Sequence, residues 1–135
     1  MASLKVIFLV VDIITSCFFV SMNGFPDTTI DGLVCLVGKV PVDSDVELLI
    51  LYMLDDLREN TTSHGYNYEV DKTMGKYHYW GNGACNGRLE NVDCDQCIIA
   101  CSNLLRNSCT LSPGAHVKLR DCRLRYEPYE FHGNW

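Results

Sequence analysis

Residues 85–122 read CNGRLENVDCDQCIIACSNLLRNSCTLSPGAHVKLRDC, and this stretch decides the fold. It holds six of the eight cysteines of the chain, spaced C-x8-C-x2-C-x3-C-x7-C-x12-C. Such a cluster is compatible with a metal site, a redox site or a framework of disulfides. Because disulfides persist only in an oxidising compartment, the N-terminus has to decide among these three interpretations.

The N-terminus has the order of regions that is typical of a secretory signal peptide. Lys5 provides a positive charge, residues 6–20 are mostly apolar, and small and turn-forming residues follow. A transmembrane anchor is the alternative, but about 15 apolar residues fall short of the roughly 20 that a bilayer requires, and Asp12 interrupts the run. We therefore predict a signal peptide over residues 1–24 and a single secreted domain over residues 25–135.

Because the chain is predicted to be secreted, we predict that the cysteine cluster forms a framework of disulfides rather than a zinc site. Cys94 and Cys97 are spaced as in thioredoxin-like redox sites. However, two positions three apart on a helix face the same side, so each can pair with a different partner in the core. Cys17 is removed with the signal peptide, which leaves seven of the eight cysteines. Because seven is odd, one thiol is expected to stay free.

The chain is acidic, with a formal net charge of −6 at pH 7. This charge argues against binding to nucleic acid through the overall electrostatic field. The four histidines are scattered without metal-ligand spacing, and no serine-hydrolase, zinc-protease or phosphate-loop motif occurs. We therefore predict a protein that is not an enzyme and that has no cofactor and no metal centre.

A first helix is predicted over residues 45–59, where apolar residues recur at helical spacing. Ser44 and Glu47 form a capping box at its start. The sequence Asn60-Thr61-Thr62 follows the helix directly, and it is an acceptor sequence for N-linked glycosylation in a secreted chain. Asn60 is therefore a predicted glycosylation site.

A second helix is predicted to begin near Asn91 or Asp93, either of which would cap its N-terminus. Its apolar face carries Cys94, Cys97 and Cys101 at helical spacing. Cys101 therefore lies one turn after Cys97 on the buried side. We interpret Cys101 as a small core residue with a free thiol rather than as a catalytic group.

Short strands account for much of the remaining sequence. One is predicted around Cys35 and another over residues 76–80, where aromatic and polar side chains alternate. Residues 81–83, Gly-Asn-Gly, then indicate a turn or bulge. The alternation in residues 117–126 changes phase near Asp121, which indicates a bulge or break there. These elements predict an α+β fold, with two helices packed on one antiparallel sheet of several short strands.

Several short motifs lie around the cysteine cluster. They are the C-x8-C-x2-C run of Cys85, Cys94 and Cys97, the preceding Trp80-Gly81 pair, Gly114-Ala115 and Val117 before Cys122, and Tyr126-Glu127. Together they resemble the plant stress-antifungal, or ginkbilobin-like, family. The resemblance implies a secreted protein of the apoplast with two helices on a five-stranded sheet. It also implies the disulfides Cys35–Cys109, Cys85–Cys94 and Cys97–Cys122, which leaves Cys101 as the free thiol.

The same resemblance implies an antifungal, carbohydrate-binding defence protein that recognises mannan or another cell-wall glycan. The positions that match the family's mannose-binding Asn, Arg and Glu are Leu36, His116 and Glu127. Only Glu127 keeps its residue type, and two lost hydrogen bonds cost roughly 2 to 4 kcal/mol. A monosaccharide bound at about millimolar affinity has only some 4 kcal/mol to lose. Mannose binding is therefore expected to be absent or very weak, with Glu127 an ordinary surface carboxylate.

The alternative is a secreted, non-enzymatic interaction module that binds a protein partner at the cell surface. A pull-down from cell-surface extracts would separate this role from inhibition of fungal growth.

Four basic residues crowd into the last strand region of this acidic chain: Lys118, Arg120, Arg123 and Arg125. Alternation places Lys118 and Arg120 on one face beside His116, and Arg123 and Arg125 together after the change of phase. Basic side chains commonly keep exposed strands from pairing with another molecule. The functional alternative is a face that binds an acidic glycan, a membrane surface or an acidic partner. In a mildly acidic medium, protonation of His116 is expected to strengthen this face.

Overall fold

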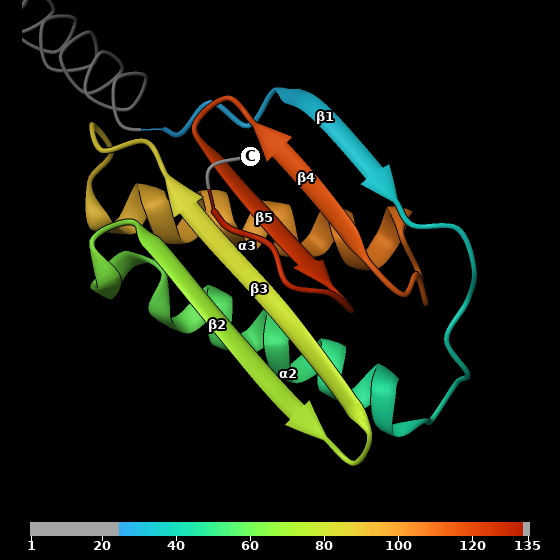
Figure 1. Ribbon diagram of the computed structural model, residues 1–135. Coiled ribbons are helices and arrows are strands. Elements are labelled where there is room, and N and C mark those ends of the chain that lie inside the picture. Colours follow the sequence, from blue (N-terminus) through green and yellow to red (C-terminus); the bar gives the residue numbers. More distant parts are fainter. Residues whose placement is uncertain (1–24, 134–135) are drawn as a thin grey trace, which may run out of the picture.

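The computed structural model describes residues 25–133. The elements are β1 (Ile30–Cys35), α2 (Asp45–Asn60), the 3-10 helix η1 (Thr62–His64), β2 (Asn67–Met74), β3 (Tyr77–Cys85), α3 (Asn91–Ser108), β4 (Ala115–Leu119) and β5 (Cys122–Glu127). The strands form one antiparallel sheet in the order β1-β4-β5-β3-β2. Both helices cover the same face of this sheet (Figure 1), and we call the other face the open face. The predicted fold class is confirmed.

The predicted signal peptide over residues 1–24 lies outside the described residues. Within residues 25–133, no helix has both the length and the apolar character that a membrane span needs.

The first predicted helix is confirmed as α2. The Oγ atom of Ser44 accepts a hydrogen bond from the backbone N–H of Glu47 at 3.2 Å, as in a capping box. The carboxylate of Glu47 differs from the expected pattern, because it accepts from the N–H of Asp43 at 2.5 Å. The residues that α2 buries against the sheet are Val46, Leu49, Ile50, Met53, Leu54 and Leu57.

The predicted turn or bulge at residues 81–83 is wrong, because β3 runs through these residues in unbroken register with β2 and β5. A Cβ atom added to Gly81 would overlap Sδ of Met53, and one added to Gly83 would overlap Oγ1 of Thr61. Gly in a strand often marks a place where another segment approaches the backbone closely. The two glycines therefore allow α2 and its C-terminal end to pack directly on the sheet.

The change of phase near Asp121 is a hairpin turn rather than a bulge within one strand. β4 and β5 pair on either side of it, with Val117 opposite Leu124. Both of these side chains are fully buried beneath the helices. The side chains at the intervening positions of both strands therefore point to the open face.

Helix α3 begins at Asn91, so neither of the two predicted caps holds its N-terminus. The N-cap residue is Glu90, which makes no side-chain capping bond. Oδ1 of Asn91 instead accepts a hydrogen bond from the hydroxyl of Tyr66 at 2.9 Å.

Three disulfides connect α3 to the sheet. They are Cys35–Cys109, Cys85–Cys94 and Cys97–Cys122, the same pairs that the family resemblance implies. Cys101 is buried and free, and its Sγ lies 3.4 Å from Sγ of Cys122. Burial raises the pKa of the Cys101 thiol to about 12. Because only the thiolate attacks a disulfide, Cys101 is inert toward its neighbour at neutral pH.

This arrangement predicts a specific pattern of thiol labelling. Alkylation of the mature protein, unreduced and denatured, should modify Cys101 alone, whereas alkylation of the native mature protein should modify no cysteine, since Cys101 is buried and protonated. Peptide mass spectrometry measures both results. A label on Cys97 or Cys122, or a covalent dimer through Cys101, would contradict the prediction.

Candidate functional site

The open face is where the candidate residues meet, because the register aligns them in rows across the strands. The central row consists of Val34 on β1, His116 on β4, Arg125 on β5, Asn82 on β3 and Glu69 on β2. Residues that are far apart in the chain thus become neighbours about 5 Å apart from strand to strand.

The three carbohydrate-binding candidates gather at one corner of this face. The backbone N–H of Leu36 donates a hydrogen bond to the carbonyl of Gly114 at 2.8 Å. A Cβ atom added to Gly114 would overlap Oε2 of Glu127, so the glycine leaves room for the carboxylate. Nδ1 of His116 lies 4.0 Å from Oε1 of Glu127. Leu36 itself brings only an aliphatic side chain to the corner.

Glu127 is not the surface carboxylate that we expected, since only 3% of it is exposed. Its Oε1 accepts a hydrogen bond from Nε of Arg125 at 3.2 Å. Its Oε2 is also buried, and no described residue gives it a hydrogen bond. A buried carboxylate oxygen without a donor is costly, and a water or a ligand hydroxyl would satisfy it. Glu127 is therefore the strongest acceptor at this corner.

The surroundings of His116 lower its pKa below the ordinary value of 6.5. Partial burial is the main cause, and the guanidinium of Arg125 on the neighbouring strand adds to it, while Glu127 acts in the opposite direction. His116 is therefore harder to protonate than a free histidine. This corrects the expectation that a mildly acidic medium readily charges it and strengthens the basic face.

The basic residues lie differently from the prediction. The β4–β5 hairpin places Lys118 opposite Arg123 and His116 opposite Arg125, all on the open face. Arg120 lies in the turn instead, and its side chain is 60% exposed. Its guanidinium nitrogens lie 3.7 Å from the carboxylate of an aspartate in β1 and 3.8 Å from that of an aspartate just before β1. The structure thus brings Lys118, Arg123 and Arg125 together and leaves Arg120 at their edge.

The segment after β5, residues 128–133, folds back over the open face (Figure 1). The guanidinium carbon of Arg125 lies 4.3 Å from the centre of the Phe131 ring. The N–H of Gly133 donates to Oε1 of Glu69 at 2.6 Å. This C-terminal tail therefore covers Arg125 and the middle of the open face.

Sequence reasoning missed an aromatic pair on the open face of β3. The rings of His78 and Trp80 stack with their centres 3.9 Å apart. Nε2 of His78 lies 2.7 Å from a carboxylate oxygen of Asp71 on β2, which holds the pair in place. The alternation of aromatic and polar residues in β3 was the available signal, since it puts both rings on one side.

The predicted glycosylation site lies at the end of α2. The side-chain amide of Asn60 donates to the backbone carbonyl of Asp56 at 3.0 Å and to its Oδ1 at 2.6 Å. The hydroxyl of Thr62 donates to the carboxylate of Asp95 on α3. Glycosylation of Asn60 stays a prediction.

A family model described as salt stress response/antifungal matches residues 38–129. The chain belongs to this family. It is 31% identical over 99 residues to antifungal protein ginkbilobin-2 of Ginkgo biloba, covering 72% of this chain and 74% of the relative. It is 29% identical over 111 residues to antifungal protein ginkbilobin-like protein 1 of Picea sitchensis, covering 81% and 84%.

Two solved structures share the fold of this stress-antifungal chain, and both are tandem DUF26 ectodomains of cysteine-rich receptor-like proteins from Arabidopsis thaliana. The ectodomain of PDLP5 matches with a TM-score of 0.70 and 20% identity, over 78% of this chain and 53% of that one. The ectodomain of PDLP8 matches with a TM-score of 0.63 and 27% identity, over 77% and 47%. The chain therefore spans about half the length of each ectodomain.

The lowered pKa of His116 can be tested by titrating its ring with NMR. We expect a midpoint below 6.5, a higher midpoint in Arg125→Gln and a lower one in Glu127→Gln, because each substitution removes one of the two neighbouring charges. Arg106→Gln removes a positive charge from α3, on the other side of the sheet, and should leave the midpoint unchanged.

The lowered pKa of His116 also determines how the stability of the fold changes with pH. Because the unfolded chain binds the His116 proton at a higher pH than the folded chain, this residue destabilises the fold as the pH falls through about 6.5. A folded-state midpoint at or above that of free histidine would contradict both statements.

Proposed function

We propose that this protein is a secreted, non-enzymatic plant defence protein that inhibits fungal growth by binding carbohydrate at the open face. Membership of the antifungal family and the ectodomain fold support the extracellular, defence-related part. The observation that carries the carbohydrate-binding part is the corner at Glu127, where a buried carboxylate oxygen lacks a donor among the described residues. Hydroxyl groups of a sugar are donors of the kind that such an oxygen binds.

The surroundings of Glu127 fit binding better than catalysis. Its neighbours on the open face are the partly buried side chain of Trp80, on the strand beside it, and the imidazole of His116. Polar groups beside an aromatic surface are the usual composition of a small-ligand site. Within residues 25–133, no cluster of three or more His, Cys, Asp or Glu side chains has a geometry that could hold a metal ion.

The ligand is expected to differ from the mannose of the family resemblance. Leu36 cannot donate or accept a side-chain hydrogen bond at the corner, and the lowered pKa of His116 leaves it a weaker substitute for a charged guanidinium. A fungal mannan that offers several contacts, or another cell-wall glycan, fits the corner better than a single mannose unit.

A second candidate function is an interaction module that binds a protein at the cell surface. It is favoured by the apolar residues exposed on and after the edge strand β1, where Ile30, Val34 and Val37 are 49%, 50% and 96% exposed. Capture of one defined membrane protein, together with no effect on fungal growth, would support this candidate over the first.

The proposed function predicts that purified protein slows fungal growth and binds a fungal cell-wall glycan on an array. Glu127→Gln should reduce both effects, since it weakens the charged acceptor at the corner. Glu59→Gln on the exposed side of α2 is the matched control and should change neither effect. Circular dichroism and the Cys101 labelling pattern verify that Glu127→Gln is folded. Growth inhibition without glycan binding, or equal behaviour of both variants, would contradict the proposal.

The family's mannose site can be rebuilt in this chain. Calorimetry should detect no mannose binding to the unmodified protein at millimolar sugar. The double variant Leu36→Asn with His116→Arg restores two hydrogen-bonding groups, so its affinity should rise by at least about tenfold. Leu48→Asn with His116→Arg is the control, because Leu48 is similarly exposed but lies on α2. Millimolar binding by the unmodified protein, or no gain in the first variant, would show that these positions do not control mannose recognition.

A further inference from the structure

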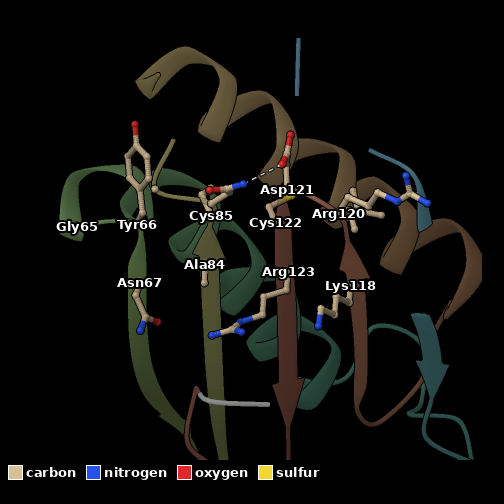
Figure 2. A pocket seen from close by; sticks show the side chains of 13 residues that line it. Gly65, Tyr66, Asn67, Ala84, Cys85, Lys118, Arg120, Asp121, Cys122 and Arg123 are labelled. Atoms are coloured by element: carbon tan, nitrogen blue, oxygen red, sulfur yellow. Dashed lines mark hydrogen bonds between the residues drawn. The ribbon is translucent and has the colours of Figure 1, made fainter. Parts of the chain in front are cut away.

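A cleft of about 580 Å³ lies at the end of the open face that carries the β4–β5 turn. Its floor includes the next row across the sheet, which we call the cleft row: Lys118, Arg123, Ala84 and Asn67, on β4, β5, β3 and β2. Figure 2 shows these four side chains together below the turn. Glu127 lies four residues from Arg123 along β5, or about 13 Å away. The cleft is therefore separate from the corner at Glu127.

The cleft exists because a small residue stands between two larger ones. Ala84 lies between Asn67 and Arg123 in the cleft row, and its methyl group cannot fill the space that they border. The volume lies within the range of roughly 300 to 1,000 Å³ that is typical of ligand sites. It is many times the roughly 30 Å³ that one water occupies, so the cleft fits a molecule much larger than a simple inorganic ion.

The rim of the cleft is held by hydrogen bonds on both sides. On one side, the hydroxyl of Tyr66 lies 2.7 Å from the carbonyl of Leu89. On the other, the side-chain amide of Asn86 donates to Oδ1 of Asp121 at 3.2 Å, and Oδ2 of Asp121 accepts from the N–H of Asp27 at 2.6 Å. Asp121, the one carboxylate among the described residues that line the cleft, is thus engaged in holding the turn in place. Because the rim is already ordered, less conformational entropy is lost when a ligand binds.

The cleft row contains two basic side chains and no acidic one. Lys118 and Arg123 lie directly opposite each other on β4 and β5, and like charges in this position destabilise an antiparallel pair. Lys118 is exposed, and no ion pair or hydrogen bond joins its side chain to another of residues 25–133. The guanidinium of Arg123 also donates to the carbonyl of Gly133, and an anion beside Lys118 would lessen the repulsion between the two cations.

A neutral hydrogen-bond donor lies at the other end of the cleft row. Oδ1 of Asn67 accepts a hydrogen bond from the side chain of Asn82 at 2.9 Å, and this bond orients the Asn67 amide. The NH₂ group of Asn67 stays available at the cleft. It lies three strands away from Lys118, or roughly 14 Å. A ligand that fills the cleft therefore meets cations at one end and a neutral donor at the other.

We propose that this cleft binds an acidic oligosaccharide, with a carboxylate or sulfate group between Lys118 and Arg123 and neutral hydroxyls toward Asn67. The inference rests on the proposed role in binding glycan and names the chemical class of one ligand. Arg and Lys are the usual partners of both anionic groups, and the amide suits the sugar hydroxyls.

Two other anionic partners fit the cleft less well. A nucleic acid would face a chain whose net charge is −6, and among residues 25–133 the basic residues that line the cleft are Lys118, Arg120 and Arg123. A lipid surface is bound by protruding basic clusters or by exposed apolar side chains, whereas these basic residues line a hollow.

The experiment is a calorimetric titration of the full protein with a short uronic acid oligomer, its methyl ester and a sulfated oligosaccharide. The free acid should bind and its uncharged methyl ester should bind at least tenfold more weakly; comparison with the sulfated sugar shows which anion is preferred. Lys118→Gln should weaken binding of the acid by about tenfold or more, because it removes a charged hydrogen bond. Lys118→Arg should retain most of the affinity, and added salt should reduce it.

Lys76→Gln is the matched control. It also removes one lysine charge, but from the β2–β3 turn, at the end of β2 and β3 that lies away from the cleft. Equal binding of acid and ester, or equal loss in Lys76→Gln and Lys118→Gln, would overturn the inference. The inference would also be overturned if Lys118→Gln weakened binding to phosphatidylserine vesicles or to a single-stranded oligonucleotide but not to the acidic oligosaccharide. If the glycan array identifies a neutral glycan whose binding is unchanged in Lys118→Gln, this inference fails and the proposed function stands. If no glycan binds at all, both fail.

Discussion

Helix α3 is cross-linked to the sheet at three points, and the rest of the structure depends on this attachment. Each of the three disulfides has one end on α3 or on its C-cap residue Cys109, and the other ends lie on β1, β3 and β5. The Cys35–Cys109 bond alone spans 74 residues, and on the chain-entropy model a loop of this length contributes roughly 4 to 5 kcal/mol. A domain of this size buries a modest core, so such cross-links supply a large share of its stability.

This attachment leaves the open face free to carry unfavourable contacts. A buried carboxylate oxygen without a donor at Glu127 and a like-charged pair at Lys118 and Arg123 each cost free energy. A fold held mainly by its other face tolerates these costs, and sites of function are where they are commonly found. A fold held in this way can keep its framework while surface positions such as Leu36 and His116 vary.

The helices and the fold class were predictable because the cysteine spacing and the apolar periodicity are local signals. The errors came from signals that depend on distant residues. A Gly-Asn-Gly sequence reads as a turn until α2 is known to press against Gly81 and Gly83. A two-residue hairpin at Asp121 changes the phase of alternation just as a bulge does. The burial of Glu127 results from Gly114 and from its pairing with Arg125, and neither contact is visible in the Tyr-Glu motif.

The C-terminal tail explains why the basic cluster on the open face has a covered part and an exposed part. Arg125 donates to Glu127, lies against the ring of Phe131 and faces His116 across the strands, so its charge is used within the protein. The tail reaches as far as Gly133, whose carbonyl accepts from Arg123, and Lys118 lies on the next strand beyond that contact. The covered part of the cluster therefore fixes the corner at Glu127, whereas Lys118 stays exposed, as the proposed binding of an external anion requires.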